Sequence, residues 1–126
     1  MEDLDFQIRF YEGLLKENPD FIDALIALGD VYTKKGRYTE GLKIDQRLVE
    51  LKPDDPIAHY NLACSYSLLK IADSCLKALE KAIQLGYLEF DYMEEDPDLE
   101  FIRQDPRFKE LILKYLQKSA WSLIVT

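Results

Sequence analysis

Two stretches of this chain, LIALGDVY at residues 25–32 and HYNLACSY at residues 59–66, lie 34 residues apart and share one pattern. Each begins with a bulky residue, has a leucine three positions later, then a small residue, and ends on a tyrosine. Apolar residues with this spacing fall on one face of an α-helix. A self-match at a period of roughly 20–50 residues indicates a repeat architecture, so the pattern predicts two similar helical units stacked side by side.

Turn signals divide the rest of the chain into pieces of helix length. Asp-Pro pairs at 55–56, 96–97 and 105–106 are expected to start helices, because the Asp side chain caps unpaired backbone N–H groups and Pro lacks such a group. We find no long alternation of apolar and polar residues, so the predicted fold class is all-α, with about seven helices. The predicted helices span residues 3–17, 20–35, 38–51, 55–69, 72–85 and 97–103, and from 106 to 118 or beyond.

Length and composition indicate one domain with a core. The chain has 126 residues, of which 48% are hydrophobic, and 24 acidic against 16 basic side chains give a net charge of −8. That acidity argues against nucleic acid as a partner, because phosphate binding depends on Lys and Arg. No apolar run approaches the ~18 residues of a membrane span, and the first residues are acidic, unlike a signal peptide. We expect a cytoplasmic protein that does not enter membranes.

No residue pattern in the chain indicates catalysis or a metal. Cys64 and Cys75 lack a second pair and a His-rich neighbourhood, which argues against a disulfide framework and a zinc site. His59 is the single histidine, and no nucleophile-and-base arrangement surrounds it in the sequence. The prediction is a chain that is not an enzyme and that uses no cofactor and no metal.

Most of the excess negative charge lies in residues 89–100, which contain seven acids and no basic residue. The stretch lacks the Asp-x-Asp-x-Asp-Gly spacing of a calcium loop. We predict a solvated segment whose apolar residues pack inward, namely Phe90, Tyr92, Met93 and Leu99. The alternative is a docking patch for a basic partner.

The 34-residue match resembles the tetratricopeptide repeat, a helix–turn–helix unit of that period. The small residues Gly29 and Ala63 match the family pattern, and Pro53 fills the closing position of the first unit. The sequence departs from the pattern at two positions. Asp45 replaces an aromatic residue in the first unit, and Lys70 occupies the position in the second unit that the turn glycine Gly36 occupies in the first. The resemblance implies two full units, at residues 22–55 and 56–89.

Both ends of the chain also resemble parts of such proteins. Residues 3–19 are similar to the second helix of a preceding unit, a leading half-unit. The sequences DPDL at 96–99 and DPRF at 105–108 resemble a terminal module that follows these repeats in many bacterial proteins. We therefore expect a single domain over 1–126, with a terminal cap at 90–118 and an apolar tail at 119–126.

The resemblance implies a protein-binding function, because the first helix of each unit lines a concave groove in this family. We expect a non-catalytic adaptor that holds a peptide or helix of a partner protein, with Ile26, Tyr60 and Leu68 as anchors and with Asp23 and Asp30 selecting basic side chains. The alternative is that some groove residues pack against the C-terminal helices and leave no open groove. The expected groove residues are Asp23, Ile26, Asp30, Thr33, Lys34, Ile57, Tyr60, Asn61, Cys64, Ser67 and Leu68.

The apolar tail supports a second hypothesis, an oligomeric regulatory or assembly subunit. Termini are ordinarily polar unless something holds them in place, yet residues 120–126 read AWSLIVT. The tail is expected either to dock on the repeats or to contact another protein, including a second copy in a homodimer. The candidate contact residues are Trp121, Leu123 and Ile124.

Overall fold

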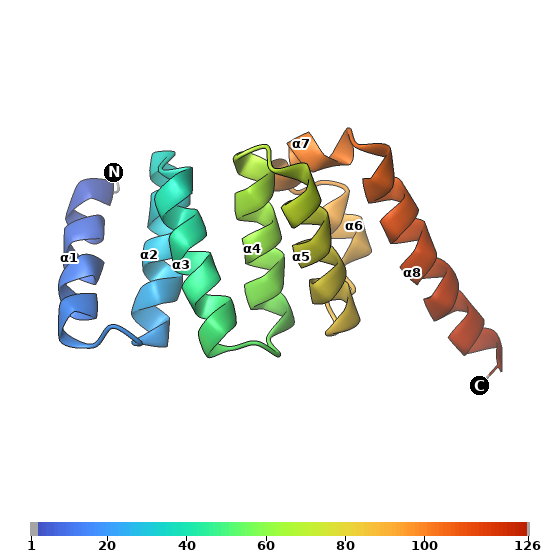
Figure 1. The fold of residues 1–126 in the computed structure, drawn as a ribbon, viewed down its shortest axis with the longest axis horizontal. Helices are drawn as coiled ribbons and strands as arrows, with labels where there is room; N and C mark the ends of the chain where they lie inside the picture. Colours follow the sequence, from blue (N-terminus) through green and yellow to red (C-terminus); the bar gives the residue numbers. More distant parts are fainter. Residues whose placement is uncertain (1–2, 126) are drawn as a thin grey trace.

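A computed structural model of the chain describes the backbone of residues 3–125 and the side chains of residues 3–118. This part contains helices and no strand, which confirms the predicted all-α fold. Figure 1 shows the long helices side by side in a row, from α1 at one end to α8 at the other. The elements are α1 (Leu4–Glu17), α2 (Ile22–Lys35), α3 (Tyr38–Leu51), α4 (Pro56–Leu68), α5 (Ala72–Gln84), α6 (Phe90–Met93), the 3-10 turn η1 (Pro97–Leu99), α7 (Glu100–Arg103) and α8 (Pro106–Val125).

The three Asp-Pro pairs start helical segments as predicted. Asp55 Oδ1 accepts the N–H of Ile57 at 2.9 Å, and Asp96 Oδ1 accepts the N–H of Asp98 at 3.0 Å. Asp105 caps α8 in the same way. Each cap pairs a backbone donor that the helix itself leaves free.

The two hairpins turn through the same backbone conformation with different residues. Gly36 ends α2 at φ 82°, in the left-handed region that glycine adopts without steric cost. The matching position after α4 is Lys70, which adopts φ 61° despite its side chain. The second hairpin therefore carries local backbone strain that the first avoids.

Small residues let α2 and α3 approach closely. A Cβ placed on Gly29 would lie 3.2 Å from Ile44 Cγ2, and one on Gly41 would lie 3.8 Å from the Gly29 carbonyl oxygen. Next along the row, α3 packs against α4, and α4 packs against α5. The hairpins therefore form one continuous stack.

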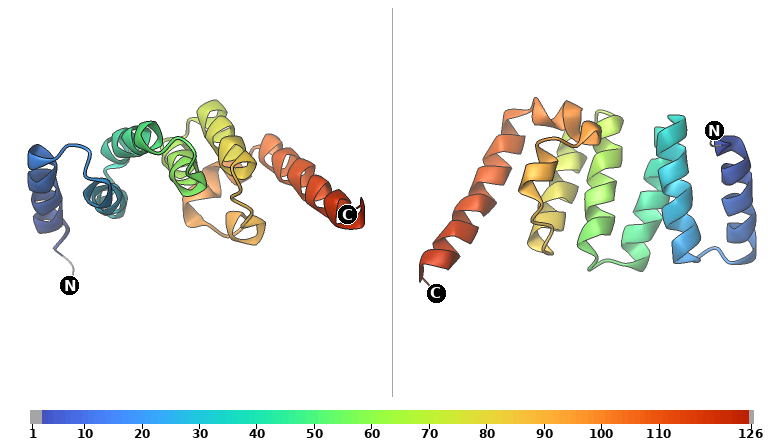
Figure 2. Two further views of the ribbon diagram at one scale, coloured as in Figure 1. Left: turned by 90° about the horizontal axis from the view of Figure 1, so that it is seen from below. Right: turned by 180° about the vertical axis from the view of Figure 1, so that it is seen from behind.

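The main hydrophobic core lies in the C-terminal half of the stack. It joins α4 and α5 to the segment of residues 90–103, in which Met93, Leu99 and Ile102 are completely buried. The left view of Figure 2 shows this segment on the same side of the stack as α2 and α4, the side expected to be the concave wall. Residues 90–103 therefore cover part of that wall.

Two details of this segment differ from the sequence prediction. The four-residue helix α6 was not predicted, because one turn is too short to show a periodic pattern. Phe90, Met93 and Leu99 are buried as predicted, but the prediction was wrong for Tyr92, which is 50% exposed. Arg103 fixes the segment by donating to the carbonyl oxygens of Met93 at 3.0 Å and Asp96 at 2.6 Å.

The last helix, α8, contacts α5 and α7 and then continues away from the stack (Figure 1). It therefore does not lie on the groove side of α2 and α4. In the described part of the chain, none of the helices has the length and apolar character needed to cross a membrane.

Candidate functional site: a groove between the repeats

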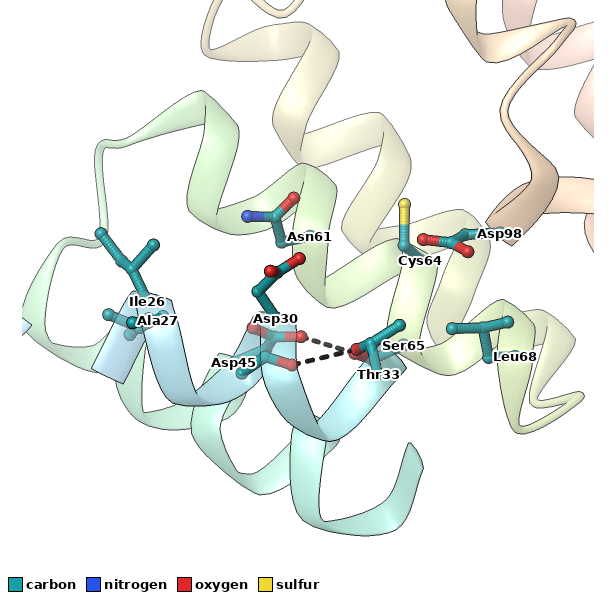
Figure 3. Close-up of a pocket in the computed structure, with 12 residues that line it drawn as sticks. Ile26, Ala27, Asp30, Thr33, Asp45, Asn61, Cys64, Ser65, Leu68 and Asp98 are labelled. Carbon is teal, nitrogen blue, oxygen red and sulfur yellow. Dashed lines mark hydrogen bonds between the residues drawn. The ribbon is translucent and has the colours of Figure 1, made fainter. Parts of the chain in front are cut away.

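A cavity of about 370 Å³ lies where the two hairpins meet. Helix α2 forms one side, α3 the floor and α4 the other side, while η1 contributes one residue at the end (Figure 3). The lining residues are Ile26, Ala27, Gly29, Asp30, Thr33, Asp45, Leu48, Asn61, Cys64, Ser65, Leu68 and Asp98.

The apolar part of the lining is partly open to solvent. Ile26 is 50% exposed on α2, and Leu68 is half-buried on α4. Ala27, beside Ile26, and Leu48 on α3 complete the apolar part of the lining (Figure 3). An exposed isoleucine at the mouth of a cavity is the kind of residue that a partner can cover.

A buried carboxylate lies at the floor of the cavity. Asp45 is only 8% exposed, and its Oδ2 accepts a 2.5 Å hydrogen bond from the Ser65 hydroxyl on the neighbouring hairpin. Burial raises the pKa of Asp45 to about 6, and the hydrogen bond from Ser65 opposes that rise. The groove therefore holds a carboxylate whose charge is poorly solvated.

Two further carboxylates face the same cavity. Burial raises the pKa of Asp98, and the negative charges of Asp96 and Asp30 raise it further. Asp30 lies on α2 and forms an ion pair with Lys34 at 3.1 Å, one turn along the same helix. The negative charge of Asp30 on α2 therefore acts on Asp98 on η1 across the groove.

A second cavity of about 390 Å³ adjoins the first and shares Leu68 and Asp98 with it. Its walls come from the turn end of α4 and from the segment of residues 97–104, and they include Lys70 and Phe101. The two cavities are therefore neighbours that meet at Leu68 and Asp98.

Six of the residues expected in the groove line the first cavity: Ile26, Asp30, Thr33, Asn61, Cys64 and Leu68. Three others do not line either cavity. Asp23 and Lys34 are exposed on α2, and Ile57 is 59% exposed near the start of α4. On α2 the middle of the expected set lines the cavity and both ends lie outside it. On α4 the start of the set lies outside, whereas Leu68 at its end lines the cavity.

The expectation that Tyr60 anchors a partner was wrong, because residues 90–103 cover it. Tyr60 is 4% exposed, its ring stacks on Tyr87 with centroids 4.0 Å apart, and its hydroxyl donates to Asp96. Ser67 has no exposed surface, and its Oγ accepts the N–H of Ile102 at 3.4 Å. Tyr60 therefore follows the alternative, in which groove residues pack against C-terminal elements, whereas Ser67 packs against Ile102 and also borders the second cavity.

Three polar residues of the first cavity were missed by sequence reasoning, namely Asp45, Ser65 and Asp98. Asp45 lies on a second helix and Asp98 on the terminal segment, whereas the family resemblance pointed only to first helices; Ser65 lies on the first helix α4, at a position outside the expected set. One signal for Asp45 was present, because it replaces an aromatic residue of the repeat pattern. A charged residue at a packing position is a reason to look for a site.

The two cysteines and the histidine are surrounded by packed or hydrogen-bonded groups of the fold. Cys64 and Cys75 are free and buried, and burial raises the pKa of both thiols. His59 is half-buried with Nε2 2.7 Å from the Pro53 carbonyl oxygen. Within the part of the chain that the structure describes, no group of His, Cys, Asp and Glu is arranged to hold a metal ion. The side chains of Trp121, Leu123 and Ile124 lie outside the described residues.

Comparisons with known proteins support the repeat assignment. Residues 29–69 match the family model of the TPR repeat. A chloroplastic protein of Arabidopsis thaliana is 35% identical over 100 residues, which make up 74% of this chain and 30% of that protein. The peroxisomal targeting signal receptor of Komagataella phaffii is 28% identical over 114 residues, or 86% of this chain and 20% of the receptor. The chain thus spans less than a third of the length of these curated relatives.

Two solved structures share the fold. The MamA RS-1 ArsTM double mutant has a TM-score of 0.75 at 22% identity, over 92% of this chain and 64% of that one. MamA 41-end from Desulfovibrio magneticus RS-1 has a TM-score of 0.67 at 22% identity, over 93% and 68% of the two chains. The chain therefore contains a TPR repeat and folds as an all-α, TPR-like stack. Its unit boundaries and the bacterial-type terminal module stay predictions.

Proposed function

We propose that this protein is a non-catalytic adaptor that binds a short segment of a partner protein in the groove between α2 and α4. The observation that carries the proposal is the cavity of about 370 Å³ at the junction of the hairpins, with half-exposed Ile26 at its mouth. Concave sites that combine an apolar wall with a few polar groups are typical binding sites. The receptor among the relatives, whose name describes recognition of a targeting signal, is consistent with this role.

The groove favours a segment of a few residues. Residues 90–103 cover Tyr60 and Ser67, so the open wall extends from Ile26 to Leu68 and then along the second cavity. Affinity would come mainly from covering Ile26 and Leu68, while the polar groups fix the register of the segment.

Peptide binding mapped by backbone NMR tests the proposal. Peptides selected on this protein from a random library are expected to shift amides of residues 26–33 and 61–68. Ile26→Ser is expected to weaken binding at least about tenfold, because it removes an apolar contact at the mouth. The matched control is Ile57→Ser, an equally exposed isoleucine outside the cavities, which should leave binding unchanged. Shifts confined to α5 and α8, which line neither cavity, or equal effects of the two variants, would overturn the groove assignment.

A second candidate is a self-associating subunit, and two exposed leucines on α8 favour it. Leu113 and Leu116 are 45% and 42% exposed on the helix that leads into the apolar tail. Light scattering over a concentration series separates the two functions. A mass that doubles, and that returns to the monomer value in Leu113→Ser/Leu116→Ser, would establish the homodimer. A constant monomer mass would exclude it.

A further inference from the structure

We propose that the cavity between α2, α3 and α4 seats the cationic end of a lysine or arginine side chain from the bound partner segment. This inference rests on the proposed function and adds the chemistry that the groove selects. Three carboxylates from three different elements line the one cavity, Asp30 from α2, Asp45 from α3 and Asp98 from η1. Among the described residues, no lysine, arginine or histidine lines it, although Lys34, outside the lining, pairs with Asp30.

Asp45 provides the strongest part of the seat, because one of its carboxylate oxygens accepts a hydrogen bond and the other is open to a further donor. The Ser65 hydroxyl donates to Oδ2, whereas no hydrogen bond to Oδ1 is found among the described residues. A Cβ built on Gly29 would lie 3.5 Å from Oδ1, so the missing side chain of this glycine leaves space beside the oxygen. A carboxylate that is more than nine-tenths buried, with a vacant acceptor oxygen in a cavity, suits an N–H donor that carries positive charge.

Asp98 has the same need for a counter-charge. The charges that act on it are those of Asp96 and Asp30, both negative, and both disfavour its ionised form. A cation placed beside Asp98 would interact favourably with Asp98 and with the neighbouring negative charges of Asp30 and Asp96. The same surroundings would repel an acidic side chain or a free C-terminal carboxylate.

The apolar wall suits the rest of such a side chain. Lysine and arginine carry apolar stems that pack on hydrocarbon while their charged ends reach polar groups. Here Ile26, Leu48 and Leu68 line the cavity together with Asp45 and Asp98, so apolar surface for a stem lies in the same cavity as carboxylates for a charged end (Figure 3). The lining of the cavity therefore matches both parts of one basic side chain.

Selection of peptides on the intact chain tests the proposal. A displayed library of random twelve-residue peptides would be selected on the wild-type protein, and the affinities of selected peptides would be measured by fluorescence anisotropy. We expect Lys or Arg to be enriched at one position. Replacing that Arg by citrulline, its neutral analogue, or that Lys by norleucine should weaken binding at least about tenfold.

Matched variants assign the effect to the cavity. Asp98→Asn and Asp45→Asn should each weaken the basic peptide by about tenfold or more, and neither should change the affinity of the neutral analogue. Asp54→Asn changes the net charge by the same amount in the exposed turn between α3 and α4, and should change affinity less than about twofold. Asp98 is only partly buried and lies on a different element from Asp45, so its variant tests the seat independently of any change in stability that Asp45→Asn causes.

The other outcomes distinguish failure of the cation seat from failure of peptide binding in the groove. Selected peptides without a conserved basic residue, or equal losses in Asp98→Asn and Asp54→Asn, would overturn the cation seat and leave groove binding standing. A library that yields no binding peptide would overturn both.

Discussion

The hydroxyl of Tyr60 on α4 donates a 2.5 Å hydrogen bond to Oδ2 of Asp96, which lies 36 residues later at the start of η1. Burial is the largest cause of a raised pKa for Tyr60, so the phenol keeps its proton and remains a donor. The Cys64 thiol lies 3.8 Å from the same carboxylate oxygen. This buried contact fastens the terminal segment to the inner wall of the second hairpin.

Tyr60→Phe should therefore lower the free energy of unfolding by about 1–3 kcal/mol, because it leaves the buried Asp96 oxygen without its main donor. Urea unfolding followed by circular dichroism measures the loss. The control is Tyr92→Phe, which removes a hydroxyl from an exposed ring and should change stability by less than about 0.5 kcal/mol. Equal changes in both variants would mean that the hydrogen bond to Asp96 contributes nothing.

Asp45 should make stability fall as the pH rises, opposite to the usual behaviour of a paired carboxylate. Its pKa is 3.8 in the reference state and about 6 in the folded protein, so between these values the folded state binds the extra proton. The cost of about 3 kcal/mol is absent below about pH 4 and complete above about pH 6.

The variant Asp45→Asn removes this titration and keeps an oxygen for Ser65. Relative to wild type, it should gain about 3 kcal/mol of stability between about pH 4 and about pH 7. Chemical denaturation at several pH values measures this difference, and Asp54→Asn at the exposed turn provides the control. A difference between Asp45→Asn and wild type that does not change with pH would contradict the assignment.

Lys70 offers a stabilising substitution at a turn. It adopts φ 61° where the first hairpin has Gly36, and an L-residue in that conformation costs about 1 kcal/mol. Lys70→Gly should raise the free energy of unfolding by about 0.5–1 kcal/mol, since part of the relief is offset by the greater freedom of glycine in the unfolded chain. Gly36→Ala at the matching position should have the opposite sign. Thermal and urea unfolding measure both, and a loss of stability in Lys70→Gly would show that the lysine side chain makes a larger contribution than its backbone strain.

Arg103 should control how firmly the terminal segment is held. Its guanidinium donates to two backbone carbonyls, those of Met93 and Asp96, and Arg103→Met removes both hydrogen bonds. We expect faster hydrogen exchange at the amides of residues 93–99, with exchange in α2 unchanged. Arg9→Met, on exposed α1, should leave exchange in both regions as in wild type. Unchanged exchange at 93–99 in Arg103→Met would show that side-chain packing alone holds the segment.

The helices were predictable where local chemistry determines them. The Asp-Pro starts at 55–56, 96–97 and 105–106 are caps made by neighbouring residues, and the pattern of Leu25, Leu28 and Tyr32 is a property of one helix face. Helix α6 was missed because its four residues are held by the burial of Phe90 and Met93 against other helices. Such tertiary contacts leave little trace in a short stretch of sequence.

The groove was predictable only in part, for the same reason. Asp30, Asn61 and Leu68 follow from the family resemblance, because they lie on first helices and are not needed for packing. Asp98 enters the groove through the path of the terminal segment, and that same path buries Tyr60. Neither consequence can be read from a helical period.

The placement of residues 90–103 on the inner face confines the groove to the junction between the hairpins and the adjoining cavity beside residues 97–104. One junction can contact only a few side chains of a ligand, so each encounter would be short-lived, with dissociation rather than approach governing occupancy. Lasting attachment to a large partner would then require several recognised segments on that partner, or several copies of this chain held close together, so that release from one groove is followed by recapture at the next.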